Sequence, residues 1–366
     1  LHHADEDIGD RAQRQCPANS QCFLQQPGER TYDQWQDAPV EQQRRQGADQ
    51  QDQRQGAKRQ DEAGAGPGLR KWLFTAGQVT EYERGAGQGG LFDVLLHPDF
   101  SRNQLIYLSF AEGNPKNNGT AIARGRLIEN RLEDLEVIFR NFTRKDTPVH
   151  YGGRMAFLAD GTLLLTTGDG FDYREAAQDV QSGLGKVLRM NDDGSPASGN
   201  PFSESPYVYS YGMRNQQGLA VSRTGVIWLH EHGPRGGDEL NRIEPGLNFG
   251  WPAITYGVDY SGAVISPYTE WEGMEQPVHY WVPSIAPSGL TVYEADLFPE
   301  WKGDLFVGAL VNREVRRLDL SGGKVIGEEA LFSELDARIR DVRTGPEGAL
   351  YILTSDRVVR VTPAKQ

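Results

Sequence analysis

Residues 150–154 form the first stretch of this chain whose types and spacing could do chemistry. They read His-Tyr-Gly-Gly-Arg. Because the glycines that follow do not shield it, the imidazole of His150 can face a pocket and act as a base near neutral pH. The same pattern also fits a turn histidine whose hydrogen bonds are satisfied locally. His150 is therefore a candidate base.

A second stretch, residues 233–241, has the composition of a calcium-binding loop. It reads Gly-Pro-Arg-Gly-Gly-Asp-Glu-Leu-Asn. Proline and paired glycines force an irregular backbone that turns carbonyl oxygens toward one point, and Asp238 and Glu239 add carboxylates. Hard oxygen ligands of this kind suit calcium. The spacing differs from that of an EF-hand loop, so a plain acidic turn is an equally good explanation.

Two further stretches carry arginine. Residues 211–218 read Tyr-Gly-Met-Arg-Asn-Gln-Gln-Gly, and residues 338–342 read Arg-Ile-Arg-Asp-Val. In a short strand, Arg338 and Arg340 point to the same side and offer two guanidinium groups to a polyanionic ligand. An exposed basic edge would show the same alternation.

A repeated unit must position these loops. In it, a turn with Asp, Gly or Pro precedes a short aliphatic strand, and the strands are expected at residues 105–108, 163–167, 226–229, 305–308 and 350–353. The 43 Gly and 20 Pro also favour an all-β fold. Intervals of roughly 40 to 60 residues match the four-stranded blade of a β-propeller, whose strand ends line a central funnel. A β-solenoid or barrel is the alternative.

Charge and composition restrict the partners. With 38 Lys and Arg against 51 Asp and Glu, the net charge of −13 argues against nucleic acid or an anionic membrane surface as a partner. No apolar run approaches the ~18 residues of a membrane span, and no signal peptide is visible. Residues 1–66 are dense in Gln, Arg and Asp, so we expect them to be disordered, with residues 67–366 forming the propeller domain.

The motifs, in this order, resemble the soluble quinoprotein glucose and aldose sugar dehydrogenases. The resemblance runs from about Gly85 to Thr362 and includes four further motifs, at residues 87–91, 97–100, 185–189 and 248–252. Members of that family are six-bladed propellers that carry pyrroloquinoline quinone (PQQ) and calcium. The resemblance implies the same fold, cofactors and periplasmic or secreted location here.

The resemblance also implies site residues. His150 matches the base that takes the proton of the anomeric hydroxyl while hydride passes to the quinone, and Asp169 and Arg340 complete the catalytic group. Cofactor contacts are implied for Gln88, Arg214, Asn215, Tyr260, Arg313, Arg338 and Arg340. Asp169 and Trp281 match substrate contacts, and the implied calcium ligands are Gly233, Pro234, Glu239 and Phe249.

The chain departs from the family pattern in three places. Val311 stands where the family often has a lysine against the cofactor, and we expect Arg313, on the same side of a strand, to replace it. Val149 replaces an acidic neighbour of the base. Residues 1–66 contain no counterpart of the strands that open the first blade, which leaves only the hairpin at 69–82 and an apparently incomplete first blade.

The leading hypothesis is therefore an oxidoreductase that converts aldoses to lactones and passes electrons to an external acceptor. Two alternatives use the same fold: a propeller that binds a partner without catalysis, and a calcium-dependent lactonase in which the metal activates water. The kind of sugar and the acceptor leave no motif in the sequence.

Overall fold

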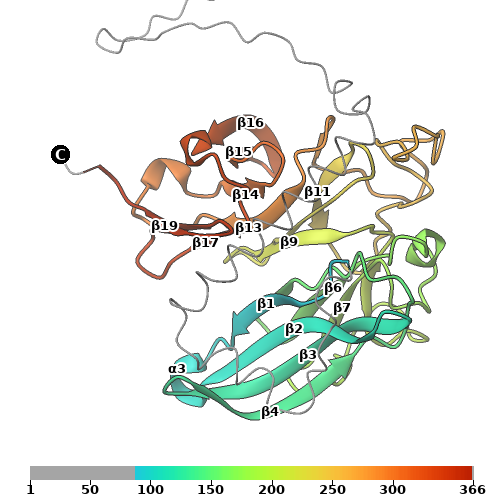
Figure 1. Ribbon diagram of the computed structural model, residues 1–366, viewed down its shortest axis with the longest axis horizontal. Helices are drawn as coiled ribbons and strands as arrows, with labels where there is room; N and C mark the ends of the chain where they lie inside the picture. Colours follow the sequence, from blue (N-terminus) through green and yellow to red (C-terminus); the bar gives the residue numbers. More distant parts are fainter. Residues whose placement is uncertain (1–86, 365–366) are drawn as a thin grey trace, which may run out of the picture. The chain divides into compact units, whose positions relative to one another are not determined.

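The computed structural model describes residues 87–364, and in this part of the chain the protein is built almost entirely of antiparallel β-sheet. Nineteen strands form four four-stranded sheets and one three-stranded sheet, each made of strands consecutive in the sequence (Figure 1). This is the repeat of a β-propeller, so the predicted all-β propeller is confirmed.

The strands have the following bounds. The first sheet contains β1 (Leu91–Leu96), β2 (Leu105–Asn114), β3 (Asn117–Ile128) and β4 (Arg131–Arg140), and the second contains β5 (Met155–Phe157), β6 (Leu163–Thr167), β7 (Lys186–Met190) and β8 (Val208–Tyr211). The third contains β9 (Gln216–Val221), β10 (Ile227–Glu231), β11 (Asp238–Ile243) and β12 (His279–Trp281). The fourth contains β13 (Pro287–Val292), β14 (Leu305–Ala309), β15 (Val315–Ser321) and β16 (Lys324–Leu331), and the last β17 (Asp341–Thr344), β18 (Leu350–Leu353) and β19 (Val358–Val361).

Every aliphatic strand expected from the repeat is the second strand of a sheet, namely β2, β6, β10, β14 and β18. The position explains the composition, because a strand paired on both edges and covered on both faces is buried throughout. All five residues of β6 are buried, for example. The turn before it needs Gly161, whose φ of +83° is left-handed, and the Asp160 carboxylate accepts the Thr162 N–H at 3.0 Å.

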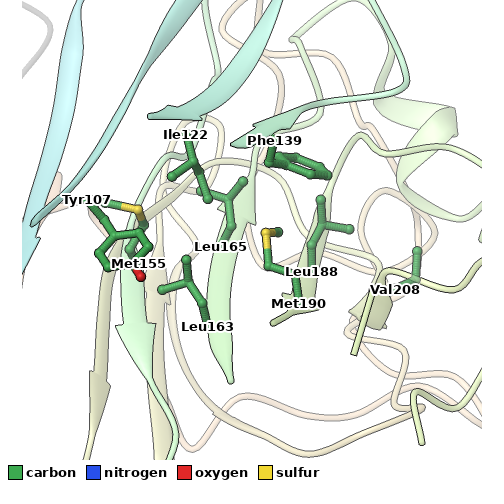
Figure 2. Close-up of a cluster of buried hydrophobic side chains, with 9 residues drawn as sticks. All are labelled: Tyr107, Ile122, Phe139, Met155, Leu163, Leu165, Leu188, Met190 and Val208. Atoms are coloured by element: carbon green, nitrogen blue, oxygen red, sulfur yellow. The ribbon is translucent and has the colours of Figure 1, made fainter. Parts of the chain in front are cut away.

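The core lies between consecutive sheets. One cluster joins strands of the first sheet, through Tyr107, Ile122 and Phe139, to β5, β6, β7 and β8 of the second (Figure 2). The first strands of successive sheets also contact one another, in the order β1, β5, β9, β13 and β17. Neighbouring blades therefore pack face to face, as in a propeller.

Charged side chains join the first strands of distant sheets. Asp93 of β1 pairs with Arg343 of β17 at 3.0 Å, and Arg343 also pairs with Asp341 at 3.0 Å. Arg154, just before β5, lies 3.5 Å from Asp341 and donates to the Gln217 carbonyl of β9 at 2.6 Å. These bonds connect the beginning of the described chain to its end.

The number of blades is not confirmed as six, because the described residues contain five sheets. The segment 1–66, the 69–82 hairpin and the incomplete first blade lie outside the described residues. The helical segments are short: α3 (Phe100–Asn103), η2 (Arg174–Ala177), η3 (Pro299–Trp301) and η4 (Ser333–Leu335). Among the described residues, no helix has the length and apolar character to cross a membrane.

Antiparallel order determines which loops meet. In an up-and-down sheet, the connection that enters the first strand and the connection between the second and third strands open at the same end. His150, Arg214 and Arg340 precede first strands, whereas Asp169 and Gly233 follow second strands. The long β11–β12 connection also reaches this end, since Asn248 forms a parallel bridge with Tyr211 at the end of β8.

Candidate active site

A buried histidine–aspartate pair lies at this end of the sheets. His150 Nδ1 is 2.7 Å from Asp169 Oδ1, and the two side chains are only 6% and 1% exposed. An Nδ1–H that donates to the carboxylate leaves the lone pair on Nε2, so the outer nitrogen is the one that can accept a proton.

The aspartate is held by three donors. Its Oδ1 also accepts the Phe171 N–H at 2.8 Å, and its Oδ2 accepts the indole N–H of Trp251 at 2.7 Å. The Trp251 indole comes from the β11–β12 connection, so two sheets contribute to one carboxylate. These three hydrogen bonds fix the orientation of the carboxylate.

The backbone of His150 is held as well. Its φ of +52° is unusual for a residue with a side chain, and the Gln88 amide oxygen accepts its N–H at 2.9 Å. The ring of Phe171 packs against the imidazole in a T-shaped arrangement, with 5.1 Å between centroids. Gln88, predicted to contact the cofactor, thus lies beside the candidate base.

Burial determines the charge of the imidazole. It lowers the pKa of His150 below its usual value, and the nearby Arg214 and Lys145 cations act in the same direction. The hydrogen bond and negative charge of Asp169 oppose this shift without overcoming it. His150 is consequently neutral, and able to accept a proton, at neutral pH.

Arg214 connects the pair to the 232–239 loop. Its Nη1 donates to the carbonyls of His232 at 3.0 Å and Gly233 at 2.6 Å, and its guanidinium lies over the rings of Trp251 and Tyr260. The carbonyl of Arg214 accepts the Asp169 N–H at 2.7 Å. Arg214, Tyr260 and the His150–Asp169 pair therefore form one group.

A small cavity in the same region brings together four groups predicted to contact cofactor or calcium. Gly233, Glu239 and Phe249 line it beside Arg214 and a second carboxylate, Glu231. Glu231 Oε2 accepts the backbone N–H groups of Arg214 at 2.5 Å and Asn215 at 3.1 Å. Burial raises the pKa of Glu239 to about 7, and burial together with Glu239 raises the pKa of Glu231.

A metal ion in this cavity would need backbone oxygens as ligands in addition to side chains. No three His, Cys, Asp or Glu side chains among residues 87–364 are arranged to hold a metal. The carboxylates of Glu231 and Glu239 and the nearby backbone carbonyls are the ligands available to a metal ion, and all of them are hard oxygen ligands. The Gly233 carbonyl already accepts from Arg214, and Pro234 lines an adjoining cavity with Phe171 and Tyr260.

Three predicted arginines lie close together. Arg338 and Arg340 are exposed on either side of buried Ile339, and desolvation with the nearby Arg340 and Arg313 cations lowers the pKa of Arg338. Arg313 pairs with Asp336 at 2.8 Å. Neither Arg338 nor Arg340 forms an ion pair with any other described residue.

The predicted strands around these arginines are wrong in detail. Strand β17 begins only at Asp341, although the alternating exposure of residues 338–340 matches the expected extended backbone. Val311 and Arg313 lie in the turn between β14 and β15, and Arg313 has a φ of +58°. Val311 and Arg313 therefore do not share a strand face, which was the reason for expecting Arg313 to replace a lysine at position 311.

Trp281 is placed differently from the other predicted site residues. Its indole is 6% exposed in the cluster with Trp228 and Leu290, and its N–H donates to Glu328 at 2.9 Å. Tyr280, beside it on β12, is 44% exposed. The burial of Trp281 gives no support to its predicted contact with a sugar.

Several residues of the site were not predicted from the sequence. Trp251 was noticed only as part of the 248–252 motif, and Glu231 was given no role. A wider groove of about 570 Å³ lies along residues 263–268. It shares Arg174 and Asp259 with the cavity that Phe171 and Tyr260 line. Lys145 was not singled out, since nothing in its local sequence distinguishes it.

Residues 75–362 match the family model described as glucose/sorbosone dehydrogenase. The chain belongs to this family. The aldose sugar dehydrogenase of Escherichia coli is 42% identical over 291 residues, which cover 76% of this chain and 78% of that protein.

Solved structures agree with this assignment. The apo-form structure of the Escherichia coli aldose sugar dehydrogenase matches with a TM-score of 0.71 and 41% identity, covering 75% of this chain and 82% of that one. The PQQ-bound aldose sugar dehydrogenase of Streptomyces coelicolor matches with a TM-score of 0.61 and 31% identity, covering 76% and 77%. This glucose/sorbosone dehydrogenase family member thus has a relative whose structure contains PQQ.

Proposed function

We propose that this protein is a PQQ-dependent oxidoreductase that oxidises aldose sugars to lactones, with His150 as the base. The observation that carries the proposal is the buried His150–Asp169 pair beside a group of cationic side chains at the same end of the sheets. The naming of relatives as aldose sugar dehydrogenases supports the substrate class.

The residues available for the cofactor fit its chemistry. PQQ carries three carboxylates, and Arg338 and Arg340 are two exposed guanidinium groups without an anionic partner among the described residues. Arg214, Asn215, Gln88 and Tyr260 are the further proposed contacts, and Arg313 remains one because it lies close enough to affect Arg338. When bound, the quinone supplies the hydride acceptor.

His150 has the protonation and surroundings that this role needs. The neutral imidazole takes the proton of the sugar hydroxyl at Nε2, and Asp169 stabilises the imidazolium that forms. Trp251 keeps Asp169 in place, while Phe171 covers the ring on one side. A positioned base of this kind typically contributes about 10² to 10⁴-fold.

Calcium is the second proposed cofactor. The buried carboxylates of Glu231 and Glu239 line one cavity, and the charge of Glu239 disfavours ionisation of Glu231. A divalent cation removes this repulsion, and the backbone carbonyls near Gly233 and Phe249 are further oxygen ligands. Removal of calcium with a chelator should therefore lower the melting temperature, and added calcium should restore it.

Reconstitution tests the proposed function. The protein is titrated with PQQ and calcium, binding is measured by calorimetry, and dye reduction is followed with glucose and other aldoses. We expect saturable PQQ binding, and a fall in kcat of at least about 100-fold in His150→Gln with binding retained. The control is His97→Gln, because His97 follows β1 at the opposite end of its sheet.

Other outcomes distinguish the alternatives. Failure to bind PQQ in the presence of calcium would contradict the proposal and favour a binding module. Calcium-dependent turnover of lactones without quinone would instead indicate a hydrolase. Tight PQQ binding with no oxidation of any aldose would remove the proposed substrate class.

A further inference from the structure

Lys145 is a buried lysine beside the site with no role in the proposed reaction. It follows β4 and is 3% exposed. Its backbone forms two hydrogen bonds with Asn118 at the start of β3, at 2.9 and 3.0 Å. Burial of an ammonium group costs free energy unless other groups replace its lost hydration, so the partners of Lys145 Nζ matter.

Two of the three partners of the ammonium group belong to the turn that carries His150. Nζ donates to Asn118 Oδ1 at 2.9 Å and to the carbonyl of Thr147, and it lies 3.6 Å from the centroid of the Tyr151 ring. Thr147 and Tyr151 flank His150 in the sequence. The lysine thus holds this turn from both sides of the base.

The stem of the same side chain reaches the turn that carries Asp169. A Cβ added to Gly170 would lie 2.7 Å from Lys145 Cδ, so only glycine fits there. The Thr147 hydroxyl donates to the Gly170 carbonyl at 2.5 Å. The two turns that supply the base and its carboxylate therefore meet around Lys145.

We propose that Lys145 is a positioning residue for His150, which fixes the two turns against each other and places a positive charge beside the His150–Asp169 pair. The inference rests on the proposed role of His150 as base. The charged groups that face Lys145 are Asp169, Asp146 and Arg144, and Arg214 also faces the imidazole.

The charge has a direction of effect that can be measured. Burial lowers the pKa of Lys145 to about 7, so the ammonium is charged in the more acidic range where His150 titrates. A cation nearby disfavours the imidazolium. Its removal should raise the pKa of His150 by about 0.5 to 1 unit, as expected for one partly screened charge.

Two neutral variants separate charge from geometry. Lys145→Met removes both the charge and the donors, whereas Lys145→Gln keeps an amide donor for Thr147 and Asn118. We expect both to raise the pKa of His150, observed by NMR of ¹⁵N-histidine in protein without cofactor. In reconstituted enzyme the acidic limb of kcat/KM should move to higher pH, with a larger loss of kcat in Lys145→Met.

Lys186 offers a matched control. It is also fully buried with a pKa lowered to about 7, but its Nζ donates to the carbonyls of Ala176, Ala177 and Leu184, and its charged neighbour is Asp179. Lys186→Met should destabilise the protein without moving the pKa of His150. An equal shift in Lys186→Met, or none in the Lys145 variants, would overturn the proposal.

A second measurement covers the case in which the Lys145 variants do not fold. The Nζ signal of Lys145 is titrated in ¹⁵N-lysine-labelled wild-type protein and in Asp169→Asn. Since Asp169 raises the pKa of Lys145, its loss should lower that pKa, and an unchanged titration would contradict the proposed proximity. Neither NMR measurement depends on activity, so an inactive enzyme would disprove the proposed function and leave this inference testable.

Discussion

Replacement of Asp169 by asparagine tests the central pair directly. Oδ1 accepts from both His150 Nδ1 and the Phe171 N–H, and Oδ2 accepts from Trp251 Nε1. Asparagine has one acceptor oxygen and one NH₂ group, so at least one of these donors will face another donor.

The size of the effect follows from the kind of bond lost. A hydrogen bond to a charged group contributes about 1.5 to 3 kcal/mol, and each 1.4 kcal/mol is tenfold, so kcat/KM should fall about 10- to 100-fold. Asp169 raises the pKa of His150, so its loss lowers that pKa. Because the neutral imidazole is the active form, the acidic limb of the profile should move to lower pH.

The assay is kcat/KM against pH, by dye reduction in enzyme reconstituted with PQQ and calcium. Asp179→Asn is the matched control, since Asp179 is exposed on the same β6–β7 connection. An unchanged plateau in Asp169→Asn, or an acidic limb that moves to higher pH, would refute the assigned relation between the two residues.

Three further predictions concern residues around the site and along the first strands. Trp251→Phe removes the indole donor to Asp169 and should lower kcat/KM about tenfold with little change in KM, as steady-state kinetics will show. Arg343→Met leaves buried Asp93 without its 3.0 Å partner and should lower the free energy of unfolding by about 1 to 3 kcal/mol in urea titrations. For Lys186, the native pKa of about 7 lies below the unfolded value, so unfolding takes up a proton between pH ~7 and ~10. The free energy of unfolding of the wild type minus that of Lys186→Met should therefore increase over this range, and a decrease would contradict the assigned burial.

The local pattern of the sequence determined the repeating unit. Aliphatic runs such as residues 163–167 and 350–353 are the strands β6 and β18, because a strand in the middle of a packed sheet buries most of its side chains. The turn before β6 was likewise predictable from Asp160 and Gly161. The Asp160 carboxylate accepts a hydrogen bond within that turn, and Gly161 can adopt its left-handed φ. His150 and Asp169 were identified because the resemblance linked them, and their 2.7 Å contact agrees with it.

Contacts between distant segments could be decided only by the tertiary structure. Trp251 and Glu231 act on residues 82 and 17 positions away, Lys145 binds Asn118, 27 positions away, and no local period marks any of the three. The turn containing Val311 and Arg313, and the burial of Trp281, depend on where β14 and β12 end. Composition and hydrophobic period indicate whether a residue faces water or the core. The contacts between particular side chains depend instead on how whole sheets pack, and the information for that packing is spread over the entire chain.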